Sequence, residues 1–258
     1  MTRYVALGSS MAAGPGIRPT VAGSPFAAGR SARNYPHLVA NARNLDLVDV
    51  TFSGATTAHV LADRQLGSPP QIEALNGLES LVTITIGGND VGYVPLLSAA
   101  SLFGPLAPIL PVTGALLNGA TRERALDHVE GALRAVGAAV RERAPHARVL
   151  FVDYLTLMPP AGTRAGRLPD HVADLARHVA AELERHTAAA AAATGCEIVR
   201  AGQASRDHHP WSARPWTVGA GLLLPWRPWP WHPNAAGMAA VADLILAQLG
   251  EPEANSRD

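Results

Sequence analysis

The sequence of 258 residues contains no lysine, so all 21 of its basic side chains are arginines. Schiff-base chemistry, a Walker A phosphate loop and a Ser-Lys catalytic dyad each require a lysine side chain. The sequence therefore excludes all three kinds of site.

The sequence also has only one cysteine, no formal net charge and no long apolar run. The single Cys196 cannot form an intramolecular disulfide. The formal net charge is zero and no basic stripe is present, which argues against nucleic-acid binding because phosphate neutralisation needs a concentrated positive surface. No uninterrupted apolar run approaches the roughly twenty residues that span a bilayer. We therefore expect a small-molecule partner, no nucleic acid and no membrane span.

The first residues of the sequence give an expectation for the cellular compartment of the protein. Met1, Thr2 and Arg3 lead directly into an apolar strand, with no room for the apolar segment of a signal peptide. This predicts a cytoplasmic protein. The alternative is a secreted protein whose signal peptide is absent from this sequence.

Alternating strand and helix patterns predict the fold class. Short apolar, β-branched runs predict five strands, and apolar residues at three- and four-residue spacing predict long helices, as over 122–143. Such alternation favours an α/β fold with a parallel sheet covered on both faces. We expect a single domain over 1–258, with a disordered tail at about 251–258. The predicted strands are 4–7, 45–52, 81–86, 149–153 and 197–200, and the main predicted helices are 34–42, 122–143, 170–193 and 235–249.

A serine at one end of the chain and a histidine near the other indicate nucleophilic catalysis. Ser10 follows the first predicted strand in Gly8-Ser9-Ser10-Met11, and His232 lies in Trp231-His232-Pro233-Asn234. A serine hydroxyl becomes a good nucleophile when a base accepts its proton, and a strand-to-helix turn exposes such a hydroxyl. We expect Ser10 to be the nucleophile and His232 the base.

Two further motifs supply candidate oxyanion donors. Gly54 and Asn89 each follow a predicted buried strand, in Phe52-Ser53-Gly54 and Gly87-Gly88-Asn89-Asp90. Ligands of parallel sheets bind at the carboxyl ends of the strands, where these residues fall. The backbone N–H groups of Ser10 and Gly54 and the Asn89 side-chain amide are expected to converge on the oxyanion.

Ser, Gly, Asn and His in this order resemble the four sequence blocks of the SGNH, or GDSL-type, hydrolase superfamily. The resemblance runs from Tyr4 to about Ala242 and is to an actinobacterial-like member, since the absence of lysine and the bias towards Ala, Arg, Pro and Gly suggest a GC-rich genome. It implies a three-layer α/β/α sandwich with a five-stranded parallel sheet, of flavodoxin-like type, and a metal-independent esterase or lipase activity without a cofactor. In that family Asp90 braces the oxyanion loop and lies outside the catalytic set.

The sequence departs from the family pattern at two positions. Ser9 replaces the aspartate that usually precedes the nucleophile, and Trp229 replaces the aspartate three residues before the histidine. A histidine base needs its Nδ1–H held by an acceptor, which a backbone carbonyl can provide. We therefore predict a Ser10–His232 dyad oriented by the main-chain carbonyl of Trp229. Asp207 folding back on His232 is the alternative.

Apart from the residues above, the sequence has one cluster of potential metal ligands, formed by Asp207, His208 and His209. Side chains of adjacent residues point in different directions, and no second pair of ligands is evident elsewhere. We therefore expect no metal site. Apolar residues over 93–119, 222–226 and 229–231 favour a hydrophobic acyl ester as substrate. Three alternatives remain. These are carbohydrate deacetylation, acyl transfer to an alcohol, and a non-catalytic ligand-binding module.

Overall fold

The computed structural model describes residues 2–103, 111–224 and 226–250, and it is built on a five-stranded parallel sheet. The strand order is β2-β1-β3-β4-β5, and every neighbouring pair is parallel. The predicted α/β fold with five parallel strands is confirmed. The strands are β1 Arg3–Gly8, β2 Asp46–Asp49, β3 Glu79–Thr85, β4 Arg148–Val152 and β5 Glu197–Val199.

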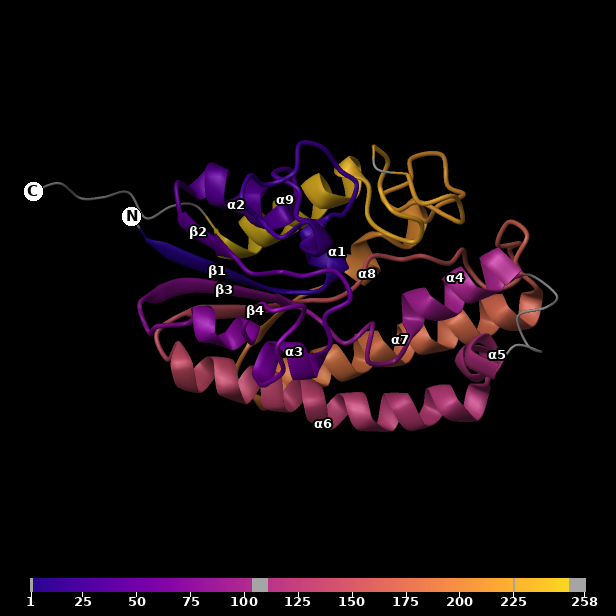
Figure 1. Cartoon of the computed structure of the whole chain (residues 1–258), viewed down its shortest axis with the longest axis horizontal. Coiled ribbons are helices and arrows are strands. Elements are labelled where there is room, and N and C mark those ends of the chain that lie inside the picture. Colours follow the sequence, from indigo (N-terminus) through magenta and orange to yellow (C-terminus); the bar gives the residue numbers. More distant parts are fainter. Residues whose placement is uncertain (1, 104–110, 225, 251–258) are drawn as a thin grey trace, which may run out of the picture.

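Helices cover both faces of the sheet and complete the three layers (Figure 1). Below the sheet in Figure 1, α6 and α7 pack side by side, and above it α2 packs against α9. The helices are α1 Ser10–Ala13, α2 Tyr35–Arg43, α3 Thr57–Leu61, α4 Tyr93–Phe103, α5 Pro111–Leu117, α6 Gly119–Arg143, α7 Asp170–Ala193, α8 Ala201–Ala204 and α9 Ala235–Leu249. Short 3-10 helices form at Phe26–Ala28, Gln71–Ala74 and Arg206–His208.

The core has two parts, one on each face of the sheet. In β1, Val5 and Leu7 pack into one part and Tyr4 and Ala6 into the other, as the two-residue period of a strand requires. All four side chains have no solvent exposure, so β1 is buried on both faces. This explains its continuous apolar run, which is typical of a parallel sheet between helix layers.

The long predicted helices are confirmed with nearly the predicted bounds. In α6 the apolar residues at three- and four-residue spacing are all buried, and α7 begins at Asp170 and ends at Ala193 as predicted. The buried α6 residues of this stripe are Leu126, Val129, Leu133, Val136 and Val140.

The strand predicted over 45–52 is shorter than expected, because β2 ends at Asp49. The chain nevertheless stays beside β1, since the Val50 N–H donates to Ala6 and the Phe52 N–H donates to Gly8, at 3.1 and 2.9 Å. These two bonds carry the chain to the carboxyl edge of the sheet and place Gly54 beside the end of β1.

Two predicted features fall partly or wholly outside the described residues. The tail at 251–258 lies outside them, as does the middle of the predicted apolar segment 93–119 at residues 104–110. Among the helices that the structure describes, none combines the length and apolar character that crossing a bilayer requires.

Candidate active site

The turn that carries Ser10, the candidate nucleophile, is fixed by the residue that ends β1. The backbone of Gly8 is held by the Gln71 side chain, which accepts from the Gly8 N–H at 2.7 Å and donates to the Gly8 carbonyl at 3.0 Å. A Cβ at Gly8 would lie 2.6 Å from the Thr85 carbonyl oxygen of the adjacent strand, which only glycine avoids. The chain therefore turns sharply into α1, with Ser10 as the first helical residue.

Ser10 and His232, which are 222 residues apart in the sequence, meet at this turn. The distance between Ser10 Oγ and His232 Nε2 is 2.8 Å, and both residues are buried. This is the hydrogen bond that a serine nucleophile makes with its general base. The two residues that the sequence paired are therefore brought together by the fold.

The predicted acceptor for the other ring nitrogen of His232 is wrong by one residue. His232 Nδ1 lies 2.8 Å from the carbonyl oxygen of Pro230, not that of Trp229. Trp231 has a positive φ of 63°, which turns the chain so that the preceding carbonyl faces the imidazole. With Nδ1–H donating to that carbonyl, the Nε2 lone pair faces the Ser10 hydroxyl.

The segment around His232 is held by pairing with residues 217 and 218. The Trp231 N–H donates to Val218, and the Val218 N–H donates to the His232 carbonyl, at 3.1 and 3.0 Å. Asn234 then caps α9 by accepting from the Gly237 N–H at 2.9 Å. These bonds stabilise the unusual backbone at Trp231, which is itself 1% exposed.

Neither Trp229 nor Asp207, the two residues predicted to orient His232, does so. The Trp229 ring lies against the imidazole edge-on, with ring centroids 5.9 Å apart, so it packs beside the base. Asp207 is exposed on the 3-10 helix Arg206–His208 and makes no hydrogen bond to His232 among the contacts of the described residues, since Nδ1 and Nε2 of His232 face Pro230 and Ser10. The orientation of His232 thus rests on the main chain of Pro230.

Three candidate oxyanion donors belong to residues that line the same pocket, namely Ser10, Gly54 and Asn89. Ser10 N, at the first position of a helix, has no intrahelical acceptor, and Gly54 N donates to no acceptor among the described residues. Asn89 Nδ2 donates one hydrogen to the Ala55 carbonyl at 2.8 Å, which fixes the amide and leaves its second hydrogen free. Gly54 has a positive φ of 81°, a conformation that favours glycine.

Asp90 braces the oxyanion loop, as the family resemblance implies. Its Oδ1 accepts from the Thr57 N–H at 3.1 Å and from the Thr57 hydroxyl at 2.5 Å. These bonds tie the loop after β3 to the start of α3, and they leave Asp90 without a link to Ser10 or His232 among the contacts of the described residues.

Tyr154 is a functional neighbour that the sequence analysis missed. Its hydroxyl accepts from the Gly88 N–H at 2.9 Å and lies 3.1 Å from Ser9 Oγ. Ser9 therefore occupies the place of the missing aspartate with a hydroxyl bonded to Tyr154. A tyrosine two residues after an apolar strand gives no sequence signal for this contact.

All of the predicted site residues line one pocket of about 330 Å³. Apolar side chains form most of its other walls, and serines of α4 contribute the remainder. The lining residues are Ser10, Gly54, Asn89, Val94, Pro95, Ser98, Ser101, Leu102, Gly221, Leu222, Leu223, Trp229, Pro230, Trp231 and His232.

Burial lowers the pKa of His232 to about 4, and the hydrogen bond to the Pro230 carbonyl offsets this only in part. A neutral imidazole accepts a proton and a protonated one does not, so the base stays competent far below the ordinary histidine pKa. The unfolded chain takes up this proton near its usual pKa of about 6.5, so stability also falls as the pH drops from about 6.5 towards 4.

We expect kcat/KM for an uncharged ester to stay level from about pH 8 to about pH 5 and to be halved near pH 4. A stopped-time assay across this range, with near-UV circular dichroism at each pH to confirm folding, measures this. An acid limb centred near the ordinary value of about 6.5, in folded protein, would contradict it.

Among the residues that the structure describes, no three His, Cys, Asp or Glu side chains gather in a way that could hold a metal ion. His208 instead stacks on Trp216, with ring centroids 3.9 Å apart.

Comparisons with known proteins agree with this geometry. The model of the GDSL-like lipase/acylhydrolase family matches residues 6–240. Lipase 2 of Streptomyces coelicolor is 32% identical over 262 residues, covering 96% of this chain and 85% of that protein. The crystal structure of an extracellular lipase from Streptomyces rimosus superposes with a TM-score of 0.79 at 27% identity, covering 97% of this chain and all of that one.

A phospholipase A1 from Streptomyces albidoflavus NA297 is similar as well, with a TM-score of 0.74 and 26% identity over 97% of this chain and 99% of that one. A family match over most of the sequence, together with lipases among its relatives in sequence and structure, shows that the chain belongs to the GDSL-like lipase/acylhydrolase family of carboxylic-ester hydrolases.

Proposed function

We propose that this hydrolase cleaves esters with apolar acyl chains by means of a Ser10–His232 dyad. Ser10 Oγ attacks the acyl carbon while His232 Nε2 takes its proton, forming a tetrahedral intermediate. The N–H groups of Ser10 and Gly54 and the Asn89 amide stabilise the oxyanion. His232 then protonates the departing alcohol, and a water molecule activated by the same base releases the acyl group from Ser10.

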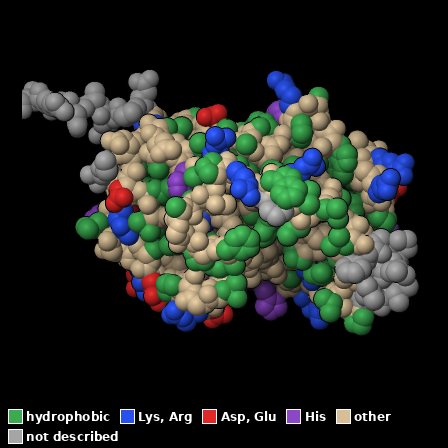
Figure 2. Space-filling view, turned by 45° about the horizontal axis from the view of Figure 1, so that its top comes forward, with side chains coloured by type: hydrophobic (Ala, Val, Ile, Leu, Met, Phe, Trp, Pro, Cys, Tyr) green, Lys and Arg blue, Asp and Glu red, His purple; other side chains and the backbone are tan. Residues whose placement is uncertain are grey.

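The observation that carries this proposal is the apolar pocket that opens beside Ser10. Val94, Pro95 and Trp229 line it together with the dyad. Leu102, Leu222 and Leu223 also line it and are between 65% and 75% exposed. Hydrophobic side chains are spread over the face of the molecule that Figure 2 brings forward. Exposed leucines that gather around a pocket are typical of a ligand-binding site, and an acyl chain would cover them.

A series of p-nitrophenyl esters from acetate to laurate tests the proposed acyl preference. Each methylene that enters an apolar pocket contributes about 0.8 kcal/mol, so kcat/KM should rise by up to about fourfold per methylene until the pocket is full. A profile restricted to acetate would favour carbohydrate deacetylation instead. Added alcohol that diverts the acyl group into a new ester would show acyl transfer.

Ser98 offers a direct test of where the acyl chain lies. It is a small, half-buried residue of α4 that lines the pocket, so Ser98→Phe should fill part of the acyl volume. We expect kcat/KM for octanoate esters to fall by about tenfold or more and that for acetate to change by less than about threefold. Ser98→Ala, the matched control, should leave the chain-length profile unchanged.

An equal loss for all chain lengths in Ser98→Phe would contradict the proposed location of the chain. Failure of wild-type protein to turn over any ester, together with failure of a serine-directed phosphonate to label Ser10, would instead favour a non-catalytic ligand-binding module.

A further inference from the structure

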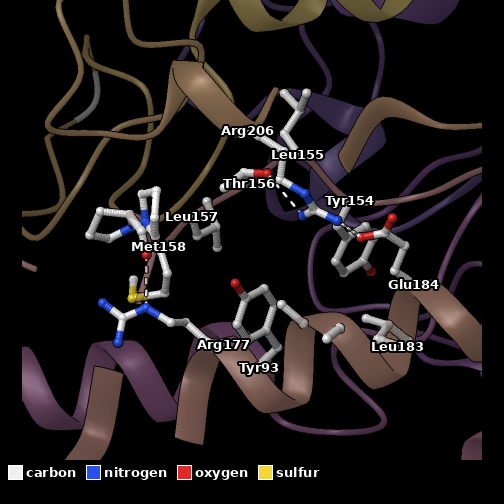
Figure 3. A pocket seen from close by; sticks show the side chains of 14 residues that line it. Tyr93, Tyr154, Leu155, Thr156, Leu157, Met158, Arg177, Leu183, Glu184 and Arg206 are labelled. Carbon is white, nitrogen blue, oxygen red and sulfur yellow. Dashed lines mark hydrogen bonds and ion pairs between the residues drawn. The ribbon is translucent and has the colours of Figure 1, made fainter. Parts of the chain in front are cut away.

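A second cavity of about 230 Å³ lies between α4, α7 and the segment that follows β4 (Figure 3). It shares no lining residue with the active-site pocket. Tyr93 of α4 and Leu183 of α7 form part of its floor, and residues 154–160 form the opposite wall. The site described above makes no use of this cavity.

The hydroxyl of Tyr93 is the feature that points to a ligand. The residue is 1% exposed, and its hydroxyl makes no hydrogen bond to any residue that the structure describes. Figure 3 shows the hydroxyl directed into the space between the labelled side chains. Burial raises the pKa of Tyr93, so the group is neutral and can both donate and accept one hydrogen bond. The hydroxyl oxygen is not sealed from solvent, so its hydrogen-bond partner, water or a ligand, lies in the cavity.

The charged side chains at the cavity already have partners. Arg177 donates to the carbonyl oxygens of Pro159 and Thr163, at 2.8 and 2.9 Å, and forms an ion pair with Asp174. Arg206 forms an ion pair with Glu184. A charged ligand would have to break these pairs in order to be neutralised, so the cavity favours a neutral one.

The remaining walls are apolar and suit a small ring. Leu155, Leu157, Met158 and Leu183 line the cavity beside the ring of Tyr154. An apolar cavity with one unpaired hydroxyl matches a molecule that has an apolar body and one hydroxyl. A cavity of about 230 Å³ is larger than the roughly 150 Å³ that holds benzene, so it admits a single aromatic ring.

The same cavity touches the active site through Tyr154. Its ring forms part of the cavity wall, and its hydroxyl bonds to Gly88 and Ser9, the neighbours of Asn89 and Ser10. A ligand that packs against this ring would restrict the tyrosine that connects the oxyanion loop and the nucleophile turn. Binding at one site and chemistry at the other are then coupled through one side chain.

We propose that this cavity binds a small neutral phenol-class molecule, hydrogen-bonded to Tyr93, and that its occupancy raises the reactivity of Ser10 through Tyr154. The binding part is independent of the catalytic roles proposed above, whereas the coupling part rests on Ser10 being the nucleophile.

Binding is tested with 4-fluorophenol and its isostere 4-fluorotoluene, followed by fluorine NMR on the full chain. We expect saturable binding of 4-fluorophenol at millimolar concentrations or below, which is the scale for a ligand of this size. Tyr93→Phe should weaken 4-fluorophenol by about threefold or more and leave 4-fluorotoluene unchanged, since only the phenol loses a hydrogen bond. The same titration in Ser10→Ala should give the wild-type result whatever the catalytic role of Ser10.

Two variants locate the bound probe. Ala181 is exposed on α7 and lines the cavity, so Ala181→Phe should block it without disturbing the core. We expect Ala181→Phe to abolish binding and Ser98→Phe, the matched change in the active-site pocket, to leave it intact. The reverse result would place the phenol in the acyl pocket and overturn the proposal, as would the absence of saturable binding or an unchanged affinity in Tyr93→Phe.

Coupling is measured as the rate at which a phosphonate labels Ser10, with and without saturating 4-fluorophenol. We expect a rate increase of about twofold or more in wild-type protein. Tyr154→Phe, which lacks the hydroxyl that bonds Ser9 and Gly88, should still bind the phenol but show no rate increase. An unchanged rate in wild-type protein that binds the phenol would overturn the coupling, while loss of labelling under all conditions would instead contradict the role of Ser10.

Discussion

Ser10→Ala is expected to lower kcat/KM for a medium-chain ester by about 10⁴-fold or more, and His232→Ala by a similar factor. The physical reason is the 2.8 Å hydrogen bond between Ser10 Oγ and His232 Nε2, since in the proposed mechanism the serine attacks only when the histidine takes its proton. For the same reason, kcat/KM of the double variant should be no lower than kcat/KM of the less active single variant. Initial rates at equal concentrations of folded protein measure all three.

Ser9→Ala is the matched control for this prediction. Ser9 is also a buried serine of the same turn, but its hydroxyl lies beside Tyr154 and not beside the base. We expect it to cost less than about tenfold. Substantial activity in Ser10→Ala, or losses in the two single variants that multiply in the double variant, would show that Ser10 and His232 do not act as one unit.

Asn89→Ala is expected to lower kcat by about 10²- to 10³-fold with little change in KM. The Asn89 amide is held by its bond to the Ala55 carbonyl, so its second hydrogen is directed before the substrate arrives. The hydrogen bond from such a fixed donor is strongest in the transition state, when negative charge develops on the substrate oxygen. Asn89→Asp, which has a similar shape but presents an acceptor, should be at least as damaging.

Asn118→Ala controls for the general effect of replacing an asparagine. Asn118 caps the exposed start of α6 by accepting from the Thr121 N–H at 3.0 Å. Its loss should reduce stability by about 1 kcal/mol and leave kcat unchanged. If Asn89→Ala instead raises KM and leaves kcat unchanged, the amide holds the substrate but does not stabilise the oxyanion.

Most of the site was predictable because it depends on position along strands. Ser10, Gly54 and Asn89 each follow an apolar run, and parallel strands bring such positions to one edge. The strands and long helices were likewise predictable, since burial on one or both faces leaves a period of two, of about 3.6, or a continuous apolar run in the sequence.

The parts that were not predictable depend on backbone conformation and on contacts far apart in the chain. The positive φ of Trp231 decides whether the carbonyl of residue 229 or 230 reaches His232, and tryptophan gives no hint of that conformation. The link from Tyr154 to Ser9 and Gly88 joins three segments, and nothing in the local sequence of any one of them predicts the others.

The main-chain acceptor of His232 also affects how this enzyme tolerates mutation. A carboxylate can be lost through a single nucleotide change, whereas no side-chain substitution at position 230 removes a peptide carbonyl. Only a change that alters the backbone path near Trp231 can withdraw it. Alignments and alanine scans are therefore blind to the group that orients His232. Replacing the peptide bond after Pro230 with an ester would weaken this carbonyl as an acceptor, and it would also remove the Trp231 N–H that donates to Val218.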